Sequence, residues 1–242
     1  MLVAGFASAA FGTNVYLVAP AAGEQCVVVD PGIEVSEGVD ELLAKYRLEP
    51  VAVLLTHGHL DHTFSVIPVG TARGLPAYIH GDDRDLLRDP MQGISSETAA
   101  MFGGRLTWVE PDDVRLITNE PLELAGLRIE IDHAPGHTPG SVMFRLPGAP
   151  DTAGQPLPGT NAPPSETLLS GDVLFAGSIG RTDLPGGSTD QMMRSLAEKV
   201  LPLSDDILVL PGHGSATTIG RERSTNPFLR QASLASPPQR GL

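Results

Sequence analysis

Four side chains that can bind metal ions follow a single apolar run of the chain. Residues 53–56 read Val-Leu-Leu-Thr, and His57, His59, Asp61 and His62 follow within six residues. Imidazole nitrogens and carboxylate oxygens are the ligands of zinc, iron or manganese. Two histidines spaced i, i+2 diverge on a helix but can converge on one ion in an extended or turning loop. The pattern therefore predicts a metal-binding loop at the carboxyl end of a strand.

Three more candidate ligands follow apolar runs further along the chain. His137 lies in a loop rich in proline and glycine, Asp172 follows residues 167–170, and His213 follows residues 207–210. Open α/β sheets gather their functional sites at the carboxyl ends of strands. We therefore expect the seven candidate ligands to meet at one sheet edge.

The pattern of short Val-, Ile- and Leu-rich runs predicts a mixed α/β protein. Helical periodicity indicates three helices, at residues 35–47, 64–74 and 189–201. The last of them begins with Ser188 and Gln191 in the spacing of a capping box. Strands are expected at residues 14–19, 25–30, 51–56, 77–80, 127–132, 141–146, 167–170 and 207–210. Hairpins and β-to-α crossovers together favour a sandwich of two mixed sheets with helices outside.

Charge and cysteine content limit the partners and the compartment. The 242 residues carry a net charge of −13, which argues against nucleic acid or an anionic membrane as a partner. A single cysteine, Cys26, permits no internal disulfide and is expected to be an inert core thiol. Residues 1–23 hold no charge, but they lack a basic segment and are better explained by two strands joined at residues 11–14. We expect a cytoplasmic protein.

Only one internal stretch has low complexity. Nine of the twenty residues from Pro147 to Glu166 are proline or glycine, which favours a mobile surface insertion over a substrate lid. Residues 236–240, Ser-Pro-Pro-Gln-Arg, are expected to form a frayed tail. With no repeat and no linker, residues 1–242 are expected to form one domain.

Taken together, the motif His57-x-His59-x-Asp61-His62 and the later His137, Asp172 and His213 resemble the metallo-β-lactamase superfamily, and within it the glyoxalase II (hydroxyacylglutathione hydrolase) branch. The resemblance covers roughly residues 10–225. It implies a four-layer αβ/βα sandwich with two divalent ions at one edge, zinc being favoured over iron or manganese. By resemblance, the first ion is held by His57, His59 and His137, the second by Asp61, His62 and His213, and Asp172 bridges both.

This resemblance also implies a chemistry. Two ions about 3.5–4 Å apart can lower the pKa of a shared water and polarise a carbonyl oxygen. The expected reaction is hydrolysis of an acyl thioester, a small-molecule substrate, by metal-bound hydroxide, which Asp61 could also orient. Asp30 is either a turn residue before Pro31-Gly32 or an acceptor for a ligating histidine. Arg181 either binds a substrate carboxylate or pairs with Asp183.

Two departures leave the thiol carrier open. The aromatic residues that follow the basic residue in glyoxalase II are replaced by Thr182-Asp183-Leu184-Pro185. The residues after His213 are too few for the helical C-terminal domain that completes a glutathione site, so this domain is expected to be absent. Oligomeric state is not indicated by the sequence.

Several other functions are weighed against the hydrolase. A persulfide dioxygenase would hold one iron at the positions of His57, His137 and Asp172, and a lactonase would share the full ligand set. A β-lactamase is disfavoured because Asp61 is followed by His62 and no cysteine occupies a later ligand position. A metal-binding scaffold without catalysis is disfavoured by the complete set of seven ligands. Of the two remaining histidines, His80 is expected to be structural or exposed, and His133 to be a hydrogen-bonding residue of its loop rather than a ligand.

Overall fold

Two six-stranded sheets form the centre of the protein. The computed structural model describes residues 1–95, 97, 99–100, 108–151 and 163–235. The first sheet has the strand order β1-β2-β3-β4-β5-β6, with bounds Leu2–Ala7, Asn14–Ala19, Gln25–Val29, Glu49–Leu54, Ala77–His80 and Val114–Ile117. Strands β1 to β3 are antiparallel neighbours, and β3 to β6 are parallel. This sheet is therefore mixed, as predicted.

The second sheet is also mixed, with β12 at one edge and β7 at the other. Its order is β12-β11-β10-β9-β8-β7. Only β10 and β11 pair in parallel, while their neighbours are antiparallel. The strand bounds are Leu122–Leu124 for β7, Leu127–His133 for β8, Val142–Pro147 for β9, Glu166–Gly171 for β10, Leu208–Pro211 for β11 and Thr217–Thr218 for β12.

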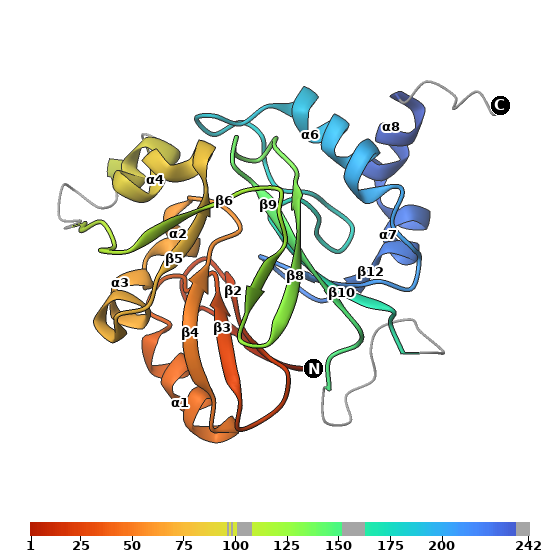
Figure 1. Cartoon of the computed structure of the whole chain (residues 1–242). Coiled ribbons are helices and arrows are strands. Elements are labelled where there is room, and N and C mark those ends of the chain that lie inside the picture. Colours follow the sequence, from red (N-terminus) through yellow and green to blue (C-terminus); the bar gives the residue numbers. More distant parts are fainter. Residues whose placement is uncertain (96, 98, 101–107, 152–162, 236–242) are drawn as a thin grey trace.

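Helices cover the outer face of each sheet (Figure 1). On the side of the first sheet lie α1 (Ser36–Tyr46), α2 (Leu60–Thr63), α3 (Val66–Val69) and α4 (Arg84–Arg88), with short 3₁₀ turns at Thr71–Arg73, Gly81–Asp83 and Pro90–Gly93. On the side of the second sheet lie α6 (Thr189–Ser195), α7 (Ile219–Thr225) and α8 (Pro227–Ala235). The α/β four-layer αβ/βα sandwich is thus confirmed.

Strand alternation divides the core into three layers. In β3, Val27 and Val29 face the second sheet, where they join Ile129 and Phe144 between the sheets. Cys26 and Val28 face the opposite way, toward α1 and α3. A third cluster lies between the second sheet and α6 and α8. Because side chains of a strand point to opposite faces in turn, each central strand supplies two layers of core at once.

Most predicted elements match the structure, with informative exceptions. The eight predicted strands correspond to β2–β5 and β8–β11, and β1 and β2 form the expected N-terminal hairpin. The predicted helix 64–74 is interrupted, since α3 gives way to a 3₁₀ turn at Gly70. The predicted helix 189–201 begins at Ser188, whose hydroxyl accepts from Gln191 N, and continues past α6 as a π-helical turn over Leu196–Val200. The strands β6, β7 and β12 were not predicted.

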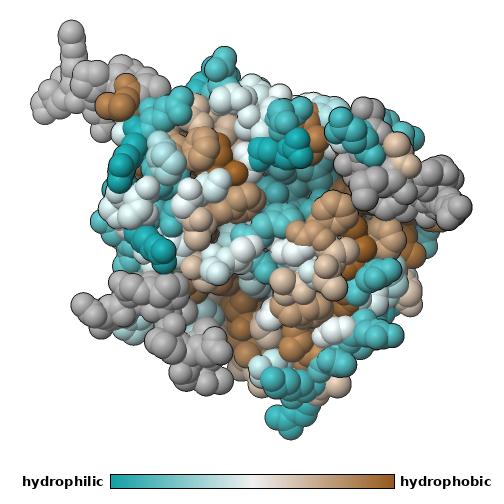
Figure 2. All heavy atoms as spheres, turned by 180° about the vertical axis from the view of Figure 1, so that it is seen from behind, coloured by the Kyte–Doolittle hydropathy of each residue, from teal (hydrophilic) through white to brown (hydrophobic). Residues whose placement is uncertain are grey.

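The low-complexity stretch lies mostly outside the described residues, because these omit 152–162. The predicted tail at residues 236–240 lies outside them as well. Within the part of the chain that is described, no helix is both long enough and apolar enough to cross a membrane. The face shown in Figure 2 carries hydrophilic and hydrophobic areas side by side.

Candidate metal centre

All seven candidate ligands lie just beyond strand ends and meet at one rim of the sandwich. His57 and His59 are in the loop after β4, and Asp61 and His62 lie in the short helix α2. The remaining ligands come from the second sheet: His137 follows β8, Asp172 follows β10, and His213 follows β11. The site is therefore assembled from both sheets, as the recurring pattern of strand and polar loop predicts.

Three buried histidines form the first group of candidate ligands. His137 Nε2 lies 2.8 Å from His59 Nδ1 and 3.2 Å from His57 Nε2. The three ring planes are close to perpendicular, with interplanar angles of 80–90°. Their nitrogens consequently converge on one point although the rings come from two different sheets.

The second group consists of Asp61, His62 and His213. The Nε2 atoms of His62 and His213 lie 3.2 Å apart. Asp61 Oδ2 is 3.2 Å from His213 Nε2 and 3.7 Å from His62 Nε2. Gly212 is required here, because a Cβ at this position would collide with Asp172 Oδ1.

Asp172 lies between the two groups. Its Oδ2 is 3.5 Å from Nε2 of His137 in the first group and 3.5 Å from Nε2 of His213 in the second. Its Oδ1 is 3.4 Å from His62 Nε2. One carboxylate can therefore reach ions bound by either group.

The chemistry of these donors fits divalent ions. Two atoms bound at 2.0–2.1 Å to a tetrahedral ion lie about 3.4 Å apart. The donor separations within the groups, from 2.8 to 3.7 Å, bracket this value. His59 Nε2 and Asp172 Oδ1 are buried without a hydrogen-bond partner among the described residues. Buried polar atoms are rarely left without partners, so Asp172 Oδ1 in particular fits the role of a cation ligand.

Electrostatics keep three of the donors, His57, His59 and Asp61, in the forms that bind metals, whereas nearby carboxylates outweigh burial and raise the pKa of His62 and His213. Burial, reinforced by His137, lowers the pKa of His59 to about 3, and burial also lowers the pKa of His57 well below its ordinary value. Burial alone would raise the pKa of Asp61, but His62 and His213 outweigh it and hold that pKa below its ordinary range. His57 and His59 are thus held as neutral imidazoles, and Asp61 as a carboxylate.

His62 and His137 each have an outer partner that orients the ring. His62 Nδ1 lies 3.0 Å from Asp30 Oδ2, and His137 Nδ1 lies 2.7 Å from the carbonyl oxygen of Arg181. A donor at Nδ1 leaves the lone pair on Nε2, which is the atom that faces the site. Asp30 also accepts hydrogen bonds from the backbone N–H and hydroxyl of Thr56, at 2.8 and 2.6 Å. Asp30 therefore lies within hydrogen-bond distance of a candidate ligand, which is the contact that the second of its two interpretations requires.

Asp83 is a buried residue of the site that was not predicted. It accepts hydrogen bonds from Gly58 N, from Thr138 Oγ1 and from Gly140 N, at 2.6–2.8 Å. Gly58 separates His57 from His59, and Thr138 follows His137, so one carboxylate joins the two loops of the first group. Asp83 follows Asp82 in a polar turn after β5, where acidic residues are common, so no sequence signal marks it.

A cavity of about 400 Å³ opens over the centre. It is bordered by candidate ligands and by the apolar side chains of Phe11, Ile94, Phe175, Ile179 and Leu184. Arg181 also lines this cavity, and its Nε and Nη2 donate to Asp183 at 2.7 and 2.8 Å. The predicted pairing with Asp183 is therefore present, at a position that also borders the cavity.

The turn from Phe175 to Ser178 forms one wall of this cavity and is hydrogen-bonded to two residues that do not line it. Asn226 Nδ2 donates to the carbonyl oxygen of Ser178 at 3.0 Å, and Gly177 N donates to Glu222 at 2.7 Å. Both Glu222 and Asn226 are fully buried. The Phe175 ring meets the His213 ring edge to face at 5.9 Å. Neither Glu222 nor Asn226 was predicted, because they lie in the C-terminal helical region, far from any motif.

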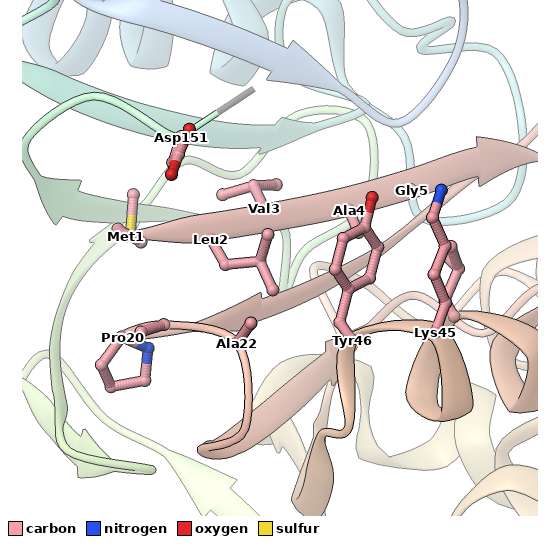
Figure 3. A pocket seen from close by; sticks show the side chains of 12 residues that line it. Met1, Leu2, Val3, Ala4, Gly5, Pro20, Ala22, Lys45, Tyr46 and Asp151 are labelled. Atoms are coloured by element: carbon pink, nitrogen blue, oxygen red, sulfur yellow. The ribbon is translucent and has the colours of Figure 1, made fainter. Parts of the chain in front are cut away.

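A second and larger cavity lies away from these histidines. Its volume is about 630 Å³, and it opens beside β1, where Tyr46 and Lys45 of α1 and Asp151 border it (Figure 3). None of the residues that line it is a histidine. The larger cavity is therefore not the candidate active site. The smaller one is, because the candidate metal ligands line it.

The fold and the site together define a class, that of metal-dependent hydrolases with their ions at the rim of an αβ/βα sandwich. Comparison with known families agrees with this class. The chain belongs to the metallo-beta-lactamase superfamily, whose family model matches residues 9–151. This superfamily binds divalent metal ions.

Three relatives are similar to this chain over most of its length. A hydroxyacylglutathione hydrolase of Haemophilus influenzae is 34% identical over 87% of this chain and 90% of its own length. A B3 metallo-beta-lactamase structure, BLEG-1, is 34% identical with a TM-score of 0.76, over 94% of this chain and 99% of that one. A protein solved in a di-iron-bound form is 35% identical with a TM-score of 0.71, over 93% and 99%. The resemblance to the glyoxalase II-like branch is consistent with these relatives.

Proposed function

We propose that this protein is a binuclear hydrolase that cleaves acyl thioesters. The observation that carries the proposal is the position of Asp172, within 3.5 Å of donors in both groups. We assign His57, His59 and His137 to one ion, Asp61, His62 and His213 to the other, and Asp172 to both. The shared layer of core between the sheets supports a single domain over residues 1–242.

When bound, two divalent ions supply an activated water and an electrophile for the carbonyl oxygen. The chain's own residues position these reactants. Asp61 Oδ2 accepts a hydrogen bond from Thr13 Oγ1 at 3.0 Å, which fixes the carboxylate where it can orient the water. Neither a serine nor a cysteine nucleophile is needed.

Substrate binding is assigned to the cavity over the centre. Its apolar side chains suit the acyl and thioether parts of a thioester, which carry no charge. Arg181 commits Nε and Nη2 to Asp183, and Nη1 remains for an anionic group of the thiol carrier. The Haemophilus hydroxyacylglutathione hydrolase supports glutathione as that carrier.

The test is a substrate panel combined with elemental analysis. The panel contains S-lactoylglutathione, an acyl-coenzyme A, a homoserine lactone, glutathione persulfide and a chromogenic β-lactam. We expect two metal ions per chain and thioester hydrolysis above the other activities, with His59→Ala losing at least about 100-fold in kcat. One iron per chain with oxygen uptake on the persulfide would overturn the proposal, as would full hydrolysis by His59→Ala.

Thiol release can be followed with a thiol reagent without interference from the protein. Cys26 is fully buried, and burial raises the pKa of its thiol to about 12. At pH 8 the group therefore stays protonated, and the native enzyme adds no background to the assay.

Two alternatives have specific support. BLEG-1, described as a B3 metallo-beta-lactamase, is similar over nearly its whole length, which makes β-lactam hydrolysis the second candidate. The di-iron-bound relative supports iron as an alternative to zinc, the metal we favour. Assays of zinc- and iron-loaded enzyme on the same panel separate metal identity from reaction type.

A further inference from the structure

A second cluster of candidate ligands lies outside the metal centre and shares none of its residues. It consists of His80, Asp82 and His133, whose ligand atoms all lie within 4.8 Å of one another. His80 is the last residue of β5 in the first sheet, and His133 is the last residue of β8 in the second. The two rings are stacked, with centroids 4.0 Å apart and planes 15° apart.

Hydrogen bonds define which ring nitrogens carry a lone pair. His133 Nε2 lies 2.9 Å from the carbonyl oxygen of Pro139 and must donate to it, so Nδ1 is the bare nitrogen. His80 Nδ1 accepts a hydrogen bond from the backbone N–H of Asp82 at 3.3 Å, so an ion bound at this nitrogen would replace that long hydrogen bond. A histidine that donates its other N–H to a backbone carbonyl is typical of metal sites, because this bond fixes the ring.

The charge state of His80 suits a ligand as well. Burial and the neighbouring His133 both lower the pKa of His80, which keeps the ring neutral at physiological pH. Neutral imidazole is the form that binds a metal ion.

The spacing to Asp82 is that of two ligands around an ion. His80 Nδ1 and Asp82 Oδ2 are 3.8 Å apart, too far for a hydrogen bond. Two ligands of a tetrahedral ion are about 3.4 Å apart. The Asp82 side chain is 60% exposed, which leaves an entry path from solvent and room for water at the open position.

We propose that His80, Asp82 and His133 form a third cation site, one that takes a borderline divalent ion such as zinc, nickel or copper. Two imidazoles and one carboxylate are the ligands these ions prefer. Binding requires the His80 ring to turn about its Cβ–Cγ bond toward His133 Nδ1, while Pro139 O holds the His133 ring in place. The ion then links the ends of β5 and β8, one strand from each sheet, and so braces the sandwich next to the loop that carries His137.

The site is tested by zinc titration of enzyme whose metal centre is already filled. Bound zinc is counted by elemental analysis after equilibrium dialysis, for the wild type and for His80→Gln, His133→Gln and Asp82→Asn. We expect the wild type to bind one more ion than the centre holds, and each variant to bind it at least about tenfold more weakly. Hydrolysis by the filled centre should be unchanged.

Matched controls distinguish this site from loose surface binding. Asp85→Asn removes a nearby exposed carboxylate and should leave the extra ion in place. Ring nitrogen resonances of His80 and His133 should shift with zinc in the wild type. Equal zinc uptake by the wild type and all three variants would overturn the proposal, and so would the absence of a third ion. If His133→Gln fails to fold, His80→Gln and Asp82→Asn decide between these outcomes.

Discussion

A single buried carboxylate, Asp83, shows how much of the metal centre depends on residues that would touch no ion. It holds the loop between His57 and His59 and the loop after His137 in fixed relation through three hydrogen bonds. Those hydrogen bonds oppose the effect of burial, which on balance raises the pKa of Asp83. The convergence of three histidines from two sheets rests on this contact.

We predict that Asp83→Asn weakens metal binding without removing a ligand. An amide cannot accept at both of its terminal atoms, so in either orientation one backbone N–H group, of Gly58 or of Gly140, would be left facing an NH₂ group. The expected loss is about 1–3 kcal/mol in the free energy of unfolding and about 10- to 100-fold in metal affinity. Urea denaturation and chelator competition measure the two effects, with the exposed Asp85→Asn as the control. Unchanged metal affinity would show that the loops hold their positions without Asp83.

At the scale of elements, the turn from Phe175 to Ser178 depends on a helix that follows it by some fifty residues. Asn226, between α7 and α8, donates to this turn, and Glu222 of α7 accepts from it. The C-terminal helical region thus determines the position of this cavity wall, whereas the strand ends determine the positions of the candidate ligands. Substrate fit and metal binding can consequently vary independently.

We predict that Asn226→Ala raises KM more than it lowers kcat. The variant frees the turn that carries Phe175, so the cavity wall loses its fixed position while all seven candidate ligands remain. The expected effect is about tenfold or less in kcat/KM, of order 1 kcal/mol. Steady-state kinetics with zinc counts on the same samples test this, and Ser224→Ala, an exposed change in α7, is the control. A loss of zinc or an equal loss in kcat would contradict the prediction.

The sequence predicts some strands with their exact bounds and misses others altogether. The strands β2 and β5 were predicted with their observed bounds, because dense apolar residues and following turns mark them. In contrast, β7 has three residues and β12 two, too short for any period to be visible. The seven candidate ligands were predicted from local patterns, while Asp83, Glu222 and Asn226 were not. Their roles arise from contacts between distant segments, which a local pattern cannot show.

For the whole molecule, the metal centre is a link between the two sheets. Both groups of candidate ligands combine residues that follow β4 with residues that follow strands of the second sheet. An ion bound there is held only by the folded chain, so binding adds to the stability of the native state.

We predict that removal of the ions lowers the melting temperature of the protein. An ion present at 100 times its Kd stabilises the folded state by about 2.7 kcal/mol, which corresponds to roughly 5–10 °C for a chain of this length. Differential scanning calorimetry before and after chelation, with zinc then restored, measures the change. In the Asp172→Asn variant, restored zinc should return little of the lost melting temperature. In the Asp183→Asn variant, which changes an exposed residue, restored zinc should return it fully. Identical melting of chelated and zinc-loaded protein would contradict the prediction.

The contacts between β2 and the His213 loop have a consequence for the synthesis of the chain. Asn14 donates through its backbone to Gly212 O at 2.7 Å, and through its side chain to Pro211 O at 3.0 Å and Gly214 O at 2.9 Å. During translation, the three histidines of the first group are all made once residue 137 has left the ribosome. The second group must wait until the last part of the chain has returned to dock on one of the first strands. Uptake of a second ion would therefore mark a polypeptide synthesised beyond His213, and one truncated before His213 would stop at a single ion.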